Sequence, residues 1–338
     1  MDKYEYRFTD GAEVFECNGR AVIKYNARIK RAGDSLKVQF YENGIMRGYP
    51  KNKDSEKAQA IKDRAAYDPA ARFAKTGRAA ARRLYDYVQC NIKRHPDHNG
   101  KKQTFKFLTL TFREDVREIK DARREFRLFV KRLNYFFTGD KKSTFLKWVA
   151  VPELQKATGR NVWHFHALFF NLPFIPVSLD KVRELQGRGA LPLDYDGRDT
   201  LFYLWGNGNV DVKAVKFSDA YDVAGYVAKY VGKGLEGDFC FASENGLVNG
   251  SRFLHSAGLF GPEWAVAFMT REQRAAVVAF LRMFAKHAKR RGELGLCYDQ
   301  FMVSHEYIGR IFGVDVRASL KRGEQLFTMF QKYSYGFL

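Results

Sequence analysis

The hydrophobic pattern between residues 104 and 231 changes repeatedly between the period of a strand and the period of a helix, and the resulting order of elements restricts the fold. Thr104–Phe112 is rich in β-branched and aromatic residues, which indicates a strand. In Asp115–Phe137, apolar residues recur every three or four positions, which indicates a helix. Two further strands are predicted over Phe145–Gln155 and Val162–Asn171.

The pattern continues with a second helix and a fourth strand. Leu179–Gln186 has a helical pattern, and Asn209–Lys216 alternates like a strand. Ser218 is then placed to cap a helix that runs to Val231, where Gly232 ends it. The order β-α-β-β-α-β is that of a ferredoxin-like or RRM-like antiparallel sheet with helices packed on it. We therefore predict an α+β protein.

The sequence on either side of this pattern is less regular, and we divide the chain into three parts. Residues 1–69 form an N-terminal extension whose fold the sequence leaves open. Residues 70–239 form the domain with the β-α-β-β-α-β order. Residues 240–338 are predicted to be mostly helical, since Thr270–Gln273 has the spacing of a capping box ahead of a basic helix that ends near Arg291.

A second pattern in the C-terminal part lies near residues 304–325. A helix, a glycine turn at Gly313 and a second helix over residues 316–320 have the spacing of a helix-turn-helix. Two packed helices joined by a glycine are a common arrangement without any role in DNA binding, so the bland explanation is favoured here.

The charge of the chain indicates a polyanionic partner. The formal net charge is +20 and the pI is about 9.7, while 46% of the residues are hydrophobic, as in a folded protein. Self-repulsion of that size is more easily explained if the protein binds nucleic acid. Some of the 30 phenylalanines and 18 tyrosines could stack on unpaired bases. The alternative is a basic enzyme with an unrelated substrate.

Cysteine usage and hydropathy bear on the compartment. The four cysteines lie far apart and form no CxxC pair, which fits neither a disulfide framework nor a cysteine-rich zinc site; they are Cys17, Cys90, Cys240 and Cys297. No run reaches 18 apolar residues, and the first residues lack the apolar segment of a signal peptide. A cytoplasmic protein with no membrane partner is expected.

Two histidines in the third predicted strand are candidate metal ligands. His164 and His166 flank Phe165, so alternation along a strand places both imidazoles on one face. Glu153 lies on the preceding strand, across a short hairpin, and would add a carboxylate. Most histidines in strands are packed or hydrogen-bonded instead, so the neighbouring residues carry this hypothesis. Such a site would leave positions open for a phosphate oxygen and water.

The donor types leave the metal and the third ligand open. Two nitrogens and one oxygen tolerate Mg²⁺, Mn²⁺ or Zn²⁺, and would also suit non-haem iron. Nothing in the sequence indicates an oxygenase cosubstrate site, and the charge of +20 argues against a small-molecule substrate. Gln155 lies on the same face as Glu153, so Gln155 or a water is an alternative third ligand.

Two tyrosines in the helix after the fourth strand are candidate nucleophiles. Tyr226 and Tyr230 are four residues apart and share a helical face. A phenol with a pKa near ~10 needs assistance at neutral pH, and Lys229 could hold a phosphate or favour the phenolate. An adjacent apolar ridge can pack on the sheet; it consists of Val223, Val227 and Val231. Two tyrosines at an interface beside a solvated lysine are the alternative.

A basic stripe on a predicted helix over Ala70–Ile92 is a candidate DNA contact. Its cations lie opposite an apolar stripe that begins at Phe73, and a solvated outer face is an equally good explanation. The candidate phosphate contacts are Arg72, Lys75, Arg78, Arg82 and Arg83, with Arg160 in the turn between two strands as a further candidate.

Three of these motifs, in this order, resemble those of the HUH endonucleases, the replication initiators of rolling-circle replicons in small single-stranded DNA phages and plasmids. Phe107–Phe112 resembles the first motif, a strand of uncertain role. Trp163–His166 resembles the metal motif, with Glu153 where the family often places a third ligand. Tyr226–Tyr230 resembles the tyrosine motif in its two-tyrosine form, and the likeness covers residues 70–235.

The resemblance implies a metal-dependent nicking and joining reaction on single-stranded origin DNA. Tyr226 would form a 5′-phosphotyrosine link and free a 3′-OH, and Tyr230 would make the second transfer. The metal would be Mg²⁺ or Mn²⁺, held by His164, His166 and Glu153. The chain has no Walker sequence, so a host helicase and polymerase are expected as partners, in the cytoplasm of a bacterial host.

Two alternatives stay open. A transposase of the same superfamily would act on hairpins at the ends of an element. A non-catalytic DNA-binding protein would keep the fold without the reaction, although two histidines with two tyrosines argue against it. The histidines precede the tyrosines, and relaxases resemble the reverse order.

Overall fold

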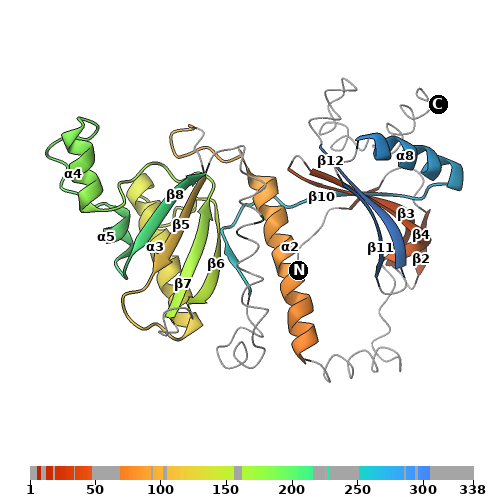
Figure 1. The fold of residues 1–338 in the computed structure, drawn as a ribbon, viewed down its shortest axis with the longest axis horizontal. Helices are drawn as coiled ribbons and strands as arrows, with labels where there is room; N and C mark the ends of the chain where they lie inside the picture. Colours follow the sequence, from red (N-terminus) through yellow and green to blue (C-terminus); the bar gives the residue numbers. More distant parts are fainter. Residues whose placement is uncertain are drawn as a thin grey trace. The chain divides into compact units, whose positions relative to one another are not determined.

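The computed structural model describes residues 6–8, 13–17, 20–33, 35–47, 69–92, 94–101, 105–155, 162–215, 225, 227, 251–284, 287–293 and 296–304. The chain forms two compact units (Figure 1). One unit is Lys62–Phe260, and the other combines Met1–Ile61 with Gly261–Leu338. The first and third parts expected from the sequence therefore share one unit.

The unit over residues 62–260 contains a five-stranded antiparallel sheet. Its strand order is β8-β5-β7-β6-β9. The strands are β5 (Phe105–Thr111), β6 (Trp148–Gln155), β7 (Val162–Phe169), β8 (Val210–Val215) and β9 (Leu254–His255). Helix α3 (Ile119–Thr138) connects β5 to β6, and the short helices α4 (Leu179–Gly187) and α5 (Leu201–Trp205) lie between β7 and β8. The predicted β-α-β-β-α-β order and α+β class are confirmed.

Helix α3 covers one face of this sheet, because its apolar residues fall on one stripe. Phe126 and Phe129 are fully buried, and the ring of Phe126 stacks on Phe165 of β7 with centroids 4.7 Å apart. Trp205 of α5 packs edge-on against Phe129 at 5.5 Å in the same core. The side chains that alternate with Phe165 along β7 therefore point to the opposite face.

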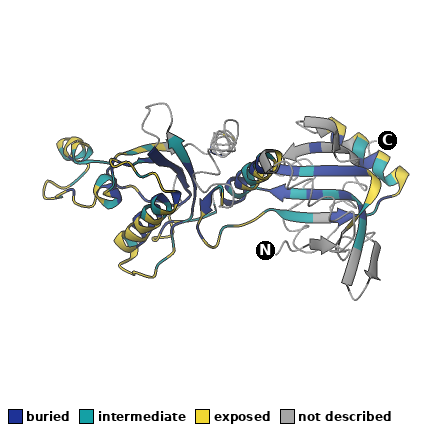
Figure 2. Ribbon diagram, turned by 90° about the horizontal axis from the view of Figure 1, so that it is seen from below, coloured by how far each residue is buried: buried dark blue, intermediate teal, exposed yellow. Residues whose placement is uncertain are grey.

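Helix α2 (Pro69–Asn91) packs on that opposite face. Leu84 and Val88 of α2 are fully buried against Phe105 and Phe107 of β5. The amphipathic helix predicted over residues 70–92 is therefore present, and it encloses the sheet between two helical layers. Figure 2 shows how the buried residues, in dark blue, concentrate on the strands.

The second unit contains a seven-stranded sheet with the order β1-β10-β3-β4-β12-β11, and β2 pairs with β3. The strands are β1 (Tyr6–Phe8), β2 (Glu13–Cys17), β3 (Arg20–Ala32), β4 (Ser35–Arg47), β10 (Glu263–Ala267), β11 (His287–Glu293) and β12 (Leu296–Ser304). Its helix α8 (Arg271–Phe284) is tied to β4 by a hydrogen bond from Arg274 Nη1 to the carbonyl of Tyr41, 3.0 Å long.

The C-terminal part differs from the mostly helical region that the sequence predicts. The capping box is present, since Gln273 N donates to Thr270 Oγ1 over 3.2 Å. The basic helix, however, ends at Phe284 rather than near Arg291, and β11 and β12 follow it. These strands complete a sheet whose other strands lie at the N-terminus, a non-local pairing that overrides helical periodicity. The predicted helix-turn-helix near residues 304–325 lies almost wholly outside the described residues.

Within the described ranges, the structure contains no helix long and apolar enough to cross a membrane.

Candidate metal centre

The side chains of Glu153, His164 and His166 meet on the α2 face of the five-stranded sheet. Glu153 on β6 is the direct cross-strand partner of His164 on β7. His166 lies two residues further along β7, so its side chain points to the same face. Because β6 and β7 form a hairpin in antiparallel register, the local fold itself brings the carboxylate beside both imidazoles.

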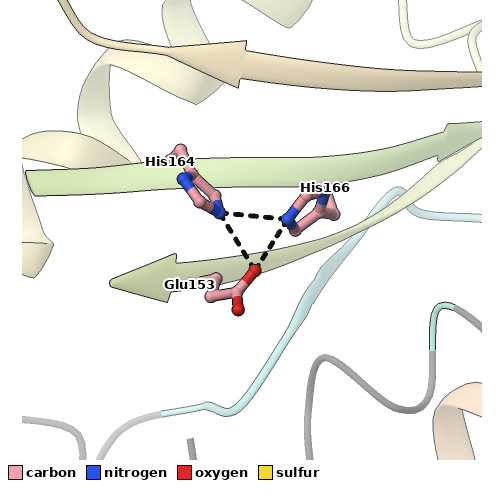
Figure 3. Close-up of side chains that lie close together, drawn as sticks. All are labelled: Glu153, His164 and His166. Atoms are coloured by element: carbon pink, nitrogen blue, oxygen red, sulfur yellow. Dashed lines mark hydrogen bonds and ion pairs between the residues drawn. The ribbon is translucent and has the colours of Figure 1, made fainter. Parts of the chain in front are cut away.

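Three donor atoms form a nearly equilateral triangle (Figure 3). Glu153 Oε2 lies 3.0 Å from His164 Nε2 and 2.8 Å from His166 Nε2. The two Nε2 atoms are 3.0 Å apart. Each atom carries a lone pair that can be directed at one point, so the group has the donors of a metal site with two nitrogens and one oxygen.

The environment keeps the carboxyl of Glu153 ionised. Burial raises its pKa, but the hydrogen bonds to His164 and His166 and the proximity of both imidazoles outweigh burial and hold the pKa at about 2. His164 and His166 are themselves largely buried. The site therefore offers a negative charge within a largely enclosed hairpin, which favours a cation.

The spacing of the triangle fits an octahedral cation. Adjacent ligands at about 2.1 Å from an octahedral ion lie about 3.0 Å apart, whereas ligands of a tetrahedral zinc lie about 3.3–3.4 Å apart. The observed separations of 2.8–3.0 Å are closer to the octahedral value. Three ligands on one side of such an ion would leave its other positions for water and substrate oxygens.

Strand β5 contributes residues that sequence reasoning did not assign to the site. Thr109 pairs with His166 in the sheet, and Thr111 pairs with His164. The hydroxyl of Thr109 lies 3.4 Å from His166 Nδ1, and the ring of Phe107 stacks on His166 with centroids 5.6 Å apart. The alternation in Phe107–Phe112 could have indicated that these side chains share a face with the histidines.

The candidate nucleophiles lie outside the described residues. Tyr226, Lys229 and Tyr230 are among the residues whose placement is not described, and so is Arg160. Their neighbour Val227 is helical and fully buried in the cluster that contains Phe107. The start of the tyrosine motif thus packs on the face of the sheet that carries the histidines.

The remaining sequence candidates have separate outcomes. Gln155 ends β6, but its side chain is outside the described part of the chain, as is that of Arg72. On α2, four cations are exposed, and they are Lys75, Arg78, Arg82 and Arg83. They project from the helix that packs beside the triad on the same sheet face, whereas the apolar stripe beginning at Phe73 is buried. Their role in binding DNA remains a prediction.

An antiparallel α+β sheet with two histidines and a glutamate on one face defines the class to which this region belongs. Residues 105–235 match the family Replication-associated protein ORF2/gene II protein, as a rolling-circle replication initiator would. The matched segment begins at the first residue of β5 and extends past Tyr230, so it contains all three motifs. Comparisons with the curated proteins and with the solved structures found no match.

Proposed function

We propose that this protein nicks and rejoins single-stranded DNA at a replication origin, and so starts and ends rolling-circle replication. The observation that carries the proposal is the convergence of Glu153, His164 and His166 within 3.0 Å of one another. The family match over the same region supports a role in replication.

The burial of Val227 supports the participation of the tyrosine helix. Val227 packs in one cluster with Phe107, and Phe107 stacks on His166. Tyr226 and Tyr230 flank Val227 within about one helical turn, since a turn contains about 3.6 residues. Both hydroxyls therefore start from positions close to the sheet face that holds the triad.

The reaction is a transfer of one phosphodiester bond. The phenolate oxygen of Tyr226 attacks the phosphorus, a tyrosine–phosphate bond forms, and the bond to the 3′ oxygen breaks. The phenol proton passes to solvent and the departing 3′ oxygen takes one up, so a free 3′-OH remains to prime synthesis. Tyr230 makes the second transfer, and Lys229 stabilises the attacking phenolate and the phosphate charge.

Glu153, His164 and His166 would hold the divalent cation, Mg²⁺ or Mn²⁺. Bound there, it would offset negative charge on the scissile phosphate and polarise it. The exposed cations of α2 would guide the DNA backbone toward this face, with Arg72 and Arg160 as further contacts. The bond energy stays in the phosphotyrosine link, so no nucleotide cofactor is required.

The decisive experiment locates the modified residue. The full-length protein is incubated with a single-stranded origin fragment and Mn²⁺, digested, and analysed by mass spectrometry. The expected result is a nucleotide adduct on Tyr226 or Tyr230. The variant with Phe at both positions should form no adduct while binding the same DNA, and an adduct that persists in this variant would overturn the assignment.

Two controls separate the alternatives. The His164→Ala/His166→Ala variant should lose cleavage but keep DNA binding, because the α2 cations are unchanged. Cleavage at the hairpins of element ends, rather than at an origin, would indicate a transposase. DNA binding without any adduct or metal binding would indicate a non-catalytic origin-binding protein.

A further inference from the structure

The strand that precedes α3 holds one metal-ligand candidate from behind. Thr109 and His166 are cross-strand partners on β5 and β7, and Thr109 Oγ1 lies 3.4 Å from His166 Nδ1. Phe107, two residues earlier on β5, stacks on the same imidazole with an interplanar angle of 15°. One ring is therefore contacted on its face and on one of its two nitrogens.

The two contacts restrict different motions of the ring. Stacking on Phe107 fixes the plane of the imidazole, and the threonine hydroxyl selects which nitrogen faces Glu153. For Nε2 to present a lone pair to a cation, Nδ1 must carry the proton of the neutral ring. That N–H would then donate to Thr109 Oγ1, which has lone pairs to accept it.

We infer that Thr109 is a positioning residue for the metal centre, acting through His166, and that this is the chemical role of the first sequence motif. The inference rests on the proposed function, because it assumes that the triad binds a divalent cation. Partners of this kind commonly fix the tautomer and orientation of a ligating histidine, and their loss weakens metal affinity about 10–100-fold.

The fold keeps β5 in register for this task. The backbone of Thr111 is held from two sides, since its N–H donates to the carbonyl of Asn209 over 2.9 Å and its carbonyl accepts from Trp205 Nε1 over 3.0 Å. Pairing with both β7 and β8 places Thr109 in the middle of the sheet. The hydroxyl therefore meets the imidazole from a backbone that is fixed on both edges.

Thr111 provides a matched control. It lies on the same strand and face and pairs with His164, but within the described part of the chain no hydrogen bond joins its hydroxyl to either imidazole. Replacing either threonine by valine removes a hydroxyl and keeps a β-branched side chain of similar size. Thr109→Ser keeps the hydroxyl and should restore the contact.

The test measures binding of Mn²⁺ alone, without DNA, to the full-length protein by calorimetry. Thr109→Val should weaken binding about 10–100-fold, while Thr109→Ser and Thr111→Val stay within about threefold of the parent protein. Equal affinity of Thr109→Val and the parent, or an equal loss in Thr111→Val, would overturn the inference. Absence of Mn²⁺ binding by the parent protein would instead refute the metal site on which the proposed function rests.

A second measurement needs no variant. Nitrogen-15 NMR of the Mg²⁺-loaded protein distinguishes the two tautomers of His166. Protonated Nδ1 is the expected result, and protonated Nε2 would contradict the role of Thr109. A residue that merely packed beside the ring would have no effect on this spectrum.

Discussion

Glu153 and His164 face each other directly across the β6–β7 pair, with Oε2 and Nε2 3.0 Å apart. Neither residue depends on a long loop for its position, because both lie on paired strands of one hairpin. A site on paired strands holds its donors more rigidly than a site on loops, and this rigidity is what a metal-assisted transfer to DNA requires.

Replacing the carboxylate of Glu153 should weaken the metal site. Glu153→Gln keeps the shape of the side chain but removes the negative charge and one good oxygen ligand, so Mn²⁺ binding should fall by about tenfold or more. Calorimetry with Mn²⁺ measures the change. Glu184→Gln is the matched control, since it removes an exposed carboxylate of α4 that is paired with Lys181 and Arg188. Unchanged affinity in Glu153→Gln would show that Gln155 or water supplies the third ligand.

The exposed cations of α2 should contribute to DNA affinity and to its salt dependence. Arg78→Ala/Arg82→Ala should weaken binding of single-stranded DNA and reduce the slope of log K against log salt by about 0.7 per lost phosphate contact. Arg127→Ala/Lys131→Ala, on exposed positions of α3 across the sheet, removes the same charge as a control. Equal losses in both variants would mean that net charge, not the α2 stripe, governs binding.

Gly208 should not tolerate a side chain. Its φ is 152°, and an added Cβ would collide with the carbonyl of Thr111 and approach the N of Arg113 to 2.7 Å. Gly208→Ala should therefore lower the free energy of unfolding by about 1–3 kcal/mol, as strained backbone commonly does. Urea denaturation measures it. Gly187→Ala, where a Cβ meets nothing within 4 Å, should leave stability nearly unchanged.

His95 should make the protein less stable in acid. Burial, together with the charges of Lys147 and Arg94, lowers the pKa of His95 from 6.5 to about 4. Between these two values the unfolded chain binds the extra proton and the folded chain does not, so this contribution to stability is lost as the pH falls from 6.5 toward 4. His95→Gln, which keeps a donor for Asn91 Oδ1, should flatten the dependence of unfolding free energy on pH in that window. An unchanged slope in this variant would contradict the prediction.

Much of the catalytic region follows from local pattern. The strands, the helix α3 and the meeting of Glu153 with the two histidines depend on alternation and on one short hairpin, which sequence displays directly. The placement of α2 on the opposite face from α3 depends instead on which strands are neighbours, and periodicity carries no such information. The same holds for Thr109, whose partner His166 lies 57 residues away.

The second unit shows where local pattern is insufficient. Strands β3 and β4 find their partners in β10 and β12, near the other end of the chain, so neither terminal segment shows its fold alone. His287–Glu293 carries the charges expected of a helix surface, yet it forms β11 because β12 offers it a partner. Pairing energy that comes from distant strands outweighs intrinsic preference at these positions.

The pairing of β4 with β12 also fixes an order of events on the ribosome. The unit over residues 62–260 leaves the exit tunnel complete, while β3 and β4 still await strands from the last quarter of the chain. The nuclease-like half can thus mature first, and the first-made strands must stay unpaired with β10 and β12 until translation ends.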